Sequence, residues 1–372
     1  MVFTRVLRVS LFGESHGPAV GVVLKGVPPG VPIDVDTINR ALERRRPGGR
    51  LASPRKEPDR AEILSGVFRG RTTGGPLAIV VRNRDVDSSF YERIKYTPRP
   101  GHGDLVAWYR YGGYQDYRGG GHFSGRRTVG LVAAGAVAAR IIELESGTRV
   151  YGYVKSIGGV EATVKPEDTQ EFRRAIDEDP LKCPDPDASE RMARLVEEAR
   201  ESGDSLGSVV ESVAFNVPPG LGDPPHWGID ASLGGSLFSI PAAKAVEIGL
   251  GLGFAGAKGS EVVDEIRGGS GSPRIVGNRA GGINAGITNG MPIIVRVAFK
   301  PPSSIRKRVR TVDLRTLDDV ELAGGGRHDP VIGPRAAPVV EAVMALVIAD
   351  HMLYAKSQRL GGVEWRMPWE SG

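Results

Sequence analysis

The chain has 372 residues, 40% of them apolar and 25% charged, which is typical of a soluble globular protein with a large core. Its net charge is +5, with 38 arginines against 11 lysines, and this suits anionic ligands; the basic residues are interleaved with acids and form no recognised nucleic-acid module. The single cysteine, Cys183, excludes an intramolecular disulfide, and the longest apolar stretch, residues 129–142, is shorter than the roughly 20 residues of a membrane span.

The first predicted elements are two strands, residues 2–12 and 20–27, which form a hairpin because each ends at a glycine or proline turn. The turn between them holds Glu14, Ser15 and His16 between two glycines. A single histidine in a turn is usually solvated, but three catalytic-type side chains together favour a functional site.

A helix capped by Asp36 or Thr37 is predicted to run to Arg45 and to lead into a basic, proline- and glycine-rich loop. Most later elements follow from apolar runs and amphipathic spacing. They are strands at 63–67 and 77–81, a long polar loop to 104, a strand at 150–165, helices at 166–178 and 186–202, a strand at 209–217, a short helix at 241–248, an irregular region at 249–290, a strand at 292–299 and a basic loop at 300–310.

The most unusual stretch is residues 118–127, where four glycines, a histidine, a serine and three arginines precede an apolar helix that ends near Glu145 at Gly147. Glycines allow close backbone approach, a helix N-terminus offers free N–H groups, and arginine binds phosphate and carboxylate. The stretch therefore fits an anion held at the start of a buried helix, although a tight turn with solvated arginines explains it about equally well.

Residues 324–335 resemble this stretch: three consecutive glycines are followed by an arginine and a histidine, then by Gly333-Pro334-Arg335 and an Ala/Val-rich helix at about 334–351. The turn Val27-Pro28-Pro29-Gly30 is likewise repeated as Val217-Pro218-Pro219-Gly220. We therefore expect a single catalytic domain over 1–372 with an internal pseudo-repeat, roughly 1–150 and 205–360, and two buried helices packed side by side.

Two familiar ligand motifs are rejected. The sequence Gly251-Leu252-Gly253-Phe254-Ala255-Gly256 fits a dinucleotide fingerprint, but 241–248 before it is predicted as helix and no strand–helix–strand unit surrounds it. Residues 120–125 have the spacing of a P-loop without its Lys-Ser/Thr pair. No Cys/His spacing suggests zinc, and no acidic loop suggests calcium.

The residues alone thus indicate an enzyme acting on a small phosphorylated acid, with a phosphate-binding regulatory module as the second possibility. Five motifs in order then resemble the signatures of the chorismate synthase family, and they cover the chain from residue 8 to about 355. They are Gly13-Glu14-Ser15-His16-Gly17, Arg44-Arg45-Arg46-Pro47-Gly48, Arg99-Pro100-Gly101-His102, Asp116-Tyr117-Arg118-Gly119-Gly120-Gly121 and Gly326-Arg327-His328-Asp329-Pro330.

The resemblance implies an anti-1,4 elimination of phosphate from 5-enolpyruvylshikimate 3-phosphate, which gives chorismate in the last common step of aromatic amino acid biosynthesis. Reduced FMN is required without net redox change. The fold implied is α+β, an internally duplicated sandwich with buried helices packed between antiparallel β-sheets. It also implies a homotetramer. We expect a cytoplasmic enzyme with no nucleic-acid or membrane partner.

Residue roles carry over from the family motifs. His16 would donate a proton or hydrogen bond at the substrate phosphate, His102 would support charge on the reduced flavin, and Asp329 would be the base that relays the substrate's C6 proton through flavin N5. The substrate-binding residues implied are Arg45, Arg50, Arg99, Arg126 and Arg327, and the FMN-binding residues implied are His122, Phe123, Ser124, Ala242, Ala285, Lys300, Pro301, Pro302, Ser303, Ser304 and Arg327.

The chain departs from the family pattern at three places. Many members have Arg-Ser-Ser where this chain has His122-Phe123-Ser124, the arginine loop containing Arg50 is about one residue shorter, and asparagine is common at Pro241. No nicotinamide-binding module is evident, so we expect an external flavin reductant rather than reduction by NADPH on the enzyme. A flavin-binding regulator and a basic RNA-binding protein stay open as alternatives, the second with strongly salt-dependent binding.

Overall fold

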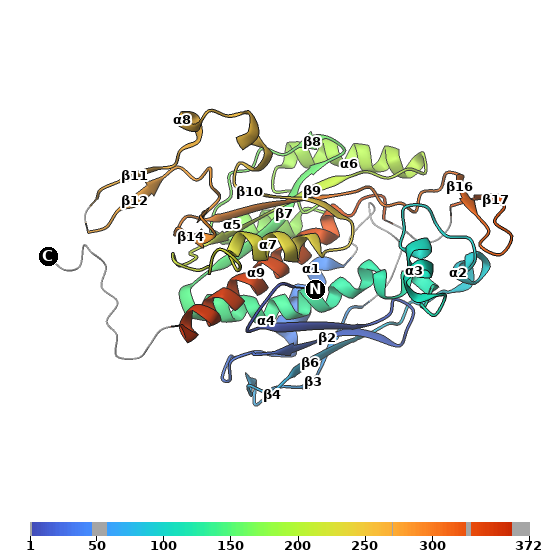
Figure 1. Ribbon diagram of the computed structural model, residues 1–372, viewed down its shortest axis with the longest axis horizontal. Coiled ribbons are helices and arrows are strands. Elements are labelled where there is room, and N and C mark those ends of the chain that lie inside the picture. The colour runs from blue at the N-terminus through green and yellow to red at the C-terminus, as the bar shows by residue number, and fades with distance from the viewer. Residues whose placement is uncertain (1, 47–57, 270, 325–328, 359–372) are drawn as a thin grey trace.

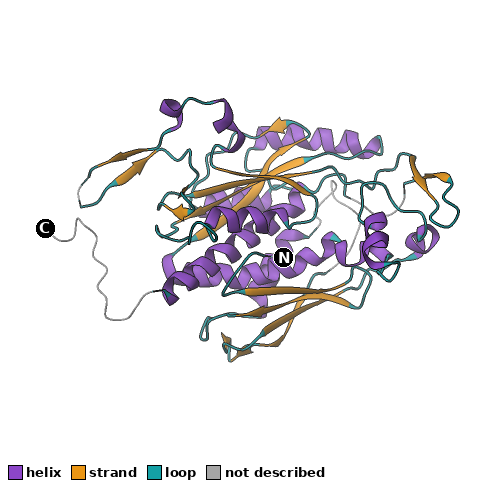
Figure 2. Cartoon of the chain, viewed as in Figure 1, coloured by secondary structure: helices purple, strands orange, loops and turns teal. Residues whose placement is uncertain are grey.

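Two antiparallel sheets enclose a layer of helices in the computed structural model, which describes residues 2–46, 58–269, 271–324 and 329–358 (Figures 1 and 2). The first sheet has the order β1–β2–β6–β3, with β1 Arg8–Gly13, β2 Ala19–Lys25, β6 Leu77–Arg82 and β3 Ala61–Ser65. The second has the order β10–β15–β9–β7–β8, with β10 Ala243–Ile248, β15 Ile293–Phe299, β9 Ser208–Phe215, β7 Arg149–Ile157 and β8 Val160–Glu161. The predicted α+β sandwich is confirmed.

The helical layer contains α1 Val35–Arg45, α4 Thr128–Ser146, α7 Ile229–Phe238 and α9 Gly333–Ser357. The two apolar helices α4 and α9 pack against each other so closely that a Cβ added to Gly135 would lie 2.3 Å from the Cβ of Ala342. Helix α9 is long and apolar enough to cross a membrane by composition, but 89% of its most apolar window is buried inside the protein. Its composition therefore reflects its place in the core.

The two sheets repeat the same topology. The order β1–β2–β6–β3 matches β7–β9–β15–β10 strand for strand, and α4 and α9 occupy corresponding places. Even the turns agree: Thr72 Oγ1 donates to Pro28 O (2.6 Å), and Thr288 Oγ1 donates to Pro218 O (2.7 Å). The predicted internal pseudo-repeat, roughly 1–150 and 205–360, stays a prediction. Its origin by duplication stays a prediction.

A helical insertion separates β8 from β9. It contains α5 Gln170–Glu178 and α6 Pro186–Glu201. The aromatic side chains of Tyr151, Tyr153 and Phe172 cluster with Ile176 of α5 and Val213 of β9. The second sheet is therefore covered on its outer face as well as by the central helices.

Several local predictions were wrong. The helix predicted over 241–248 does not form: residues 243–248 are strand β10, because pairing with β15 outweighs the helix propensity of an alanine-rich segment. The rejected dinucleotide fingerprint at 251–256 does follow a strand, contrary to the reason given for rejecting it. That strand is antiparallel to its neighbour and the fingerprint forms a 3-10 helix, so the strand–helix–strand unit of a dinucleotide site is not present here. Helix α1 is capped by Asp34, and α5 begins at 170 with Thr169 as its cap.

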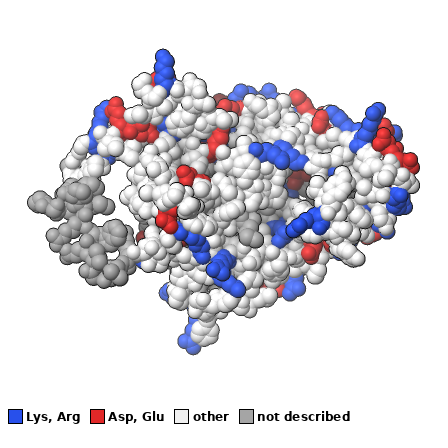
Figure 3. All heavy atoms as spheres, in the orientation of Figure 1, with Lys and Arg blue, Asp and Glu red and all other residues white. Residues whose placement is uncertain are grey.

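Other elements had no sequence prediction. The loop expected to reach residue 104 contains α2 Ser89–Ile94, and the aromatic segment after it forms α3 Asp104–Tyr111. The remaining short elements are β4 Val67–Phe68, β5 Arg71–Thr72, α8 Gly259–Val262, β11 Glu265–Arg267, β12 Arg274–Val276, β13 Ile283–Asn284, β14 Ile287–Thr288, β16 Val309–Val312 and β17 Asp319–Leu322. On the face drawn in Figure 3, Lys and Arg are interspersed with Asp and Glu.

Candidate active site

A cleft of about 380 Å³ lies where the two halves meet. Both buried helices start at its wall: Thr128 begins α4, and Ile332, Arg335 and Ala336 lie at the start of α9. The positive ends of two helix dipoles therefore face the same space. Five cationic side chains and two carboxylates also line it: Arg45, Arg99, Arg126, Lys300 and Arg335, with Asp104 and Asp329.

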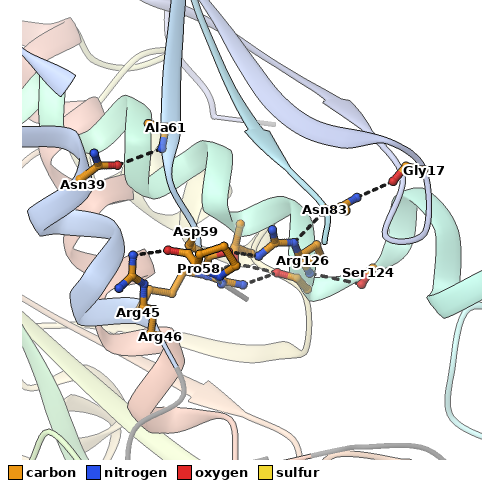
Figure 4. Close-up of polar contacts among 12 residues, drawn as sticks. Gly17, Asn39, Arg45, Arg46, Pro58, Asp59, Ala61, Asn83, Ser124 and Arg126 are labelled. Atoms are coloured by element: carbon orange, nitrogen blue, oxygen red, sulfur yellow. Dashed lines mark hydrogen bonds and ion pairs between the residues drawn. The ribbon is translucent and has the colours of Figure 1, made fainter. Parts of the chain in front are cut away.

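Arg45, at the end of α1, is buried and held on three sides (Figure 4). Its Nε donates to Thr128 Oγ1 (3.0 Å), its Nη2 to Gly125 O (2.9 Å), and its Nη1 lies 3.4 Å from Asp59 Oδ2. Burial, followed by repulsion from Arg335, lowers the pKa of Arg45 to about 9, although Asp59 opposes this shift. The cleft thus holds more positive charge than its own carboxylates neutralise.

Arg126 lies in the short 3-10 helix that leads into α4. Its Nη1 forms an ion pair with Asp59 Oδ1, and its Nε donates to Asn83 Oδ1 at 2.9 Å. Asn83 in turn donates to Gly17 O at 2.8 Å, which ties the arginine to the hairpin turn that carries His16 (Figure 4). Ser124 Oγ accepts the backbone N–H of Arg126 at 3.2 Å. These contacts fix the arginine at the cleft wall.

Arg99 is positioned by a carboxylate and an aromatic ring. Its Nε and Nη2 donate to the two oxygens of Asp104, at 2.7 and 2.8 Å, and its guanidinium lies 5.2 Å from the ring centre of Tyr91. Burial opposes ionisation of Asp104, but the hydrogen bonds and charge of Arg99 outweigh it and lower the pKa of Asp104. Both groups are therefore charged at neutral pH.

Asp329 and Arg335 form a second carboxylate–arginine pair in the cleft. Arg335 Nη1 lies 2.8 Å from Asp329 Oδ2. The Nε of Arg335 is buried and has no hydrogen-bond partner among the described residues. A buried donor without an acceptor is costly, so it is suited to an acceptor on a ligand.

The expected flavin residues gather on the opposite wall. His102 Nε2 and Ser304 Oγ are 2.8 Å apart, and Lys300 Nζ donates to Ser303 Oγ at 2.7 Å. The backbone N–H of Lys300 donates to the carbonyl of Ala242 (3.0 Å), whose φ of 72° is left-handed. Gly101 is also left-handed, and a Cβ there would lie 2.6 Å from Ser303 Oγ, so only glycine fits.

The cleft thus brings together most of the predicted site residues, namely His102, Asp329, Arg45, Arg99, Arg126, Phe123, Ser124, Ala242, Lys300, Pro302, Ser303 and Ser304. Arg50 and Arg327 lie outside the described residues, and their roles stay predictions.

Four predicted residues do not line the cleft. His16 lies behind Gly119, where its Nδ1 is 2.9 Å from Ser88 Oγ and its ring meets Tyr91 edge-on. His122 stacks beside Phe123 and Tyr111, Ala285 is exposed in the β13–β14 turn, and Pro301 lies between two lining residues. Their roles stay predictions.

Sequence analysis missed Asp59, Asp104, Tyr91 and Arg335. Arg335 had a signal, because Gly333-Pro334-Arg335 occupies the place of Gly125-Arg126 in the stretch that residues 324–335 resemble. Asp59 is one of two acidic residues, with Glu57, in a largely basic loop, which is a weaker signal. Tyr91 had none.

Comparisons with known proteins agree along the whole chain. The family model described as chorismate synthase matches residues 7–353. A chorismate synthase from Aeropyrum pernix is 64% identical over 99% of this chain and 96% of the relative, and one from Thermococcus kodakarensis is 53% identical over 94% and 96%. A crystal structure of chorismate synthase superposes with a TM-score of 0.74 at 33% identity, covering 95% of this chain and 93% of that one. The chain therefore belongs to the chorismate synthase family.

Proposed function

We propose that this chain converts 5-enolpyruvylshikimate 3-phosphate to chorismate and phosphate in the cleft, with reduced FMN bound beside the substrate. The observation that carries the proposal is the convergence of five cationic side chains on one cleft that also holds the starts of α4 and α9. The substrate has a phosphate and two carboxylates, so it needs several fixed positive charges to leave water.

The cleft residues fit a flavin mononucleotide as well as the substrate. Lys300, Ser303 and Ser304 offer an ammonium and two hydroxyls suited to a phosphate or to ring heteroatoms, and Phe123 offers an aromatic face that is 42% exposed. The Nε of Arg335, which has no partner within the described part of the chain, gives one further donor. Reduced FMN, when bound, supplies an electron-rich ring beside the developing allylic cation.

In the elimination, the carbon–oxygen bond to phosphate breaks, a ring proton leaves, and the freed electron pair becomes the new double bond. Arg45 and Arg126 bind the departing phosphate and stabilise its growing charge. His16, which lies directly behind Gly119 of the cleft lining, is the proposed donor of a proton or hydrogen bond to it, and contacts with Ser88 and Tyr91 fix the imidazole ring. Asp329 accepts the ring proton, and Arg335 at 2.8 Å orients this carboxylate.

The test is phosphate release under anaerobic conditions with chemically reduced FMN. Wild-type protein is expected to release phosphate, and Asp329→Asn or His16→Ala to lower turnover by roughly 10²–10⁴-fold because each removes a proton-transfer group. His226→Ala, in an exposed turn, is the matched control. Full turnover in both site variants would refute the role assignment, and no release by wild type would refute the function.

Three further features belong to this proposal: a homotetramer, a cytoplasmic location and an external source of reducing equivalents. Mixing protein, oxidised FMN and NADPH without other reductant is expected to leave the flavin absorbance unchanged. Bleaching of the flavin would mean that the chain reduces its own cofactor. FMN binding without turnover in the assay above would instead favour a flavin-binding regulator.

A further inference from the structure

Asp59 lies behind the cleft wall and joins the two arginines assigned to the phosphate. Its side chain is 1% exposed; one carboxylate oxygen faces Arg45 and the other forms an ion pair with Arg126 (Figure 4). Its φ of 42° is in the left-handed region, where a residue other than glycine is uncommon. The fold therefore holds a carboxylate in a strained backbone position beside two cations.

We propose that Asp59 is a positioning residue that sets the spacing of Arg45 and Arg126 for the phosphate of the substrate. This inference rests on the proposed function. Two guanidinium groups repel each other, and a shared carboxylate holds both in place while its own charge stays out of contact with the ligand. Described residues engage three of the five N–H groups of Arg45, so two are left for an anion in the cleft.

The charges around Arg45 explain why the carboxylate is needed. Arg335 and Arg126 face Arg45 and lower its pKa, whereas Asp59 and Asp329 raise it, and the balance with burial is a pKa of about 9. Without the charge of Asp59, only Asp329 of these groups offsets the repulsion that Arg335 and Arg126 exert on Arg45. Arg45 would then lose its proton at lower pH, and substrate affinity would decline with it.

The test is the pH profile of Asp59→Asn, measured as kcat and KM between pH 6 and 10. The variant is expected to raise KM at least tenfold at pH 7 with a smaller change in kcat, and to move the alkaline limb of kcat/KM to lower pH. A merely structural defect would reduce active protein without moving that limb. The matched control is Asp177→Asn, which removes one of the two carboxylate partners of the neighbouring Arg44 (2.7 Å) and should leave the limb in place.

Asp59→Glu is a second variant in case the asparagine variant does not fold. It keeps the charge, so the alkaline limb should stay near its wild-type position while KM rises because the longer side chain changes the spacing. The inference would be overturned if Asp59→Asn kept both the KM and the alkaline limb of kcat/KM of the wild type. It would also be overturned if Asp59→Glu shifted that limb. Either of these outcomes can be observed only if the wild-type protein is active. Failure of the proposed function is distinct, because the wild-type protein would then release no phosphate.

A second, independent observation concerns the projecting hairpin β11–β12, which reaches away from the two sheets (Figure 1). Its strands pair only with each other among the described strands, and Ile266 is 73% exposed. Isolated two-stranded hairpins are marginally stable in water. Within it Arg267 stands directly opposite Arg274, a pairing of like charges that is unfavourable.

We propose that β11 pairs antiparallel with β11 of a second copy of this chain about a twofold axis at Ile266. Glu265 of each copy then lies opposite Arg267 of the other, so the charges of the short strand complement themselves. The pairing creates a four-stranded sheet and brings the two copies of Ile266 together. It also adds a second carboxylate near Arg267, whose Nε already donates to Glu265 Oε2 of its own strand at 2.9 Å. The free edge of β11 is thereby covered.

Charge reversal tests this interface through the mass of the assembly, measured by light scattering after size exclusion. Arg267→Glu sets like charges across the axis and is expected to halve the mass, whereas the double swap Glu265→Arg with Arg267→Glu restores complementarity and the mass. Arg194→Glu, in an exposed i,i+4 pair with Glu190 on α6, is the control and should leave the mass unchanged. An unchanged mass in Arg267→Glu, no recovery in the double swap, or a monomeric wild type would overturn the proposal.

Discussion

Glu341, on α9, holds α1 and the helical insertion against the core. Its carboxylate accepts hydrogen bonds from Arg44 Nη1 and Nη2 (2.6 and 3.0 Å), from Arg173 Nη1 (2.9 Å) and from the backbone N–H of Gly152 (2.8 Å). Replacing it by glutamine keeps the shape and removes the charge. Arg44 precedes Arg45 in α1, so this anchor also fixes the helix end that reaches the cleft.

The cost of Glu341→Gln follows from the pKa of the carboxyl group. Burial opposes its ionisation, but the charges and hydrogen bonds of Arg173 and Arg44 outweigh burial and lower the pKa from 4.5 to about 2. A shift of this size corresponds to about 3 kcal/mol of stability at neutral pH. Because the unfolded chain takes up the proton first as pH falls, this stabilisation is complete above about pH 5.5 and is lost between about pH 4.5 and 2.

The assay is urea unfolding of wild type and Glu341→Gln at several pH values. The difference in free energy of unfolding should fall from about 3 kcal/mol at pH 7 to about 1 kcal/mol near pH 2.5. Glu143→Gln breaks an exposed i,i+3 pair with Arg140 and should change stability by less than about 0.5 kcal/mol at every pH. A pH-independent difference for Glu341→Gln would refute the electrostatic reasoning.

Three further predictions follow from packing, turns and charge. Gly135→Ala should destabilise by about 1–3 kcal/mol in thermal unfolding because its Cβ would meet Ala342, whereas Gly234→Ala in α7, with open space around it, should be neutral or stabilising. Thr288→Val should cost about 1–3 kcal/mol, seen as a lower midpoint of urea unfolding, because it leaves buried partners of the turn unsatisfied. Substrate affinity measured by titration calorimetry should decline as pH rises above about 9, where Arg45 loses its proton; constant affinity to pH 10 would contradict that assignment.

The sequence predicted the elements whose signals are local. Helix α4 begins and ends almost where its apolar run and Gly147 require, and α6 starts at Pro186 with a cap from Asp185. The hairpin of β1 and β2 was predicted because glycine and proline mark its turns. The paired α4 and α9 were predicted from their glycine and alanine content, since small residues permit close helix contact.

Other features depend on residues far apart in the chain. Strand β10 contains Ala243 and Ala245, whose propensity favours a helix, and only its partner β15 about 50 residues later makes it a strand. Asp59 gains its role from Arg45 and Arg126, and the last of these lies 67 residues away. No local pattern encodes such a contact, so the arginines could be predicted as ligands while the carboxylate that holds them could not.

The repeated topology explains why an arginine–carboxylate pair stands at the start of each of the two buried helices, and the two pairs have different properties. Arg126 stands at the start of α4 and Arg335 at the start of the matching α9, and each has an aspartate partner. In the first half the partner is Asp59, 1% exposed and outside the cleft lining; in the second it is Asp329, 17% exposed and in the lining. A carboxylate sealed behind the wall can only hold its arginines, whereas one at the cleft surface can also reach a substrate proton. This difference in burial supports the positioning role proposed for Asp59 and the proton transfer proposed for Asp329.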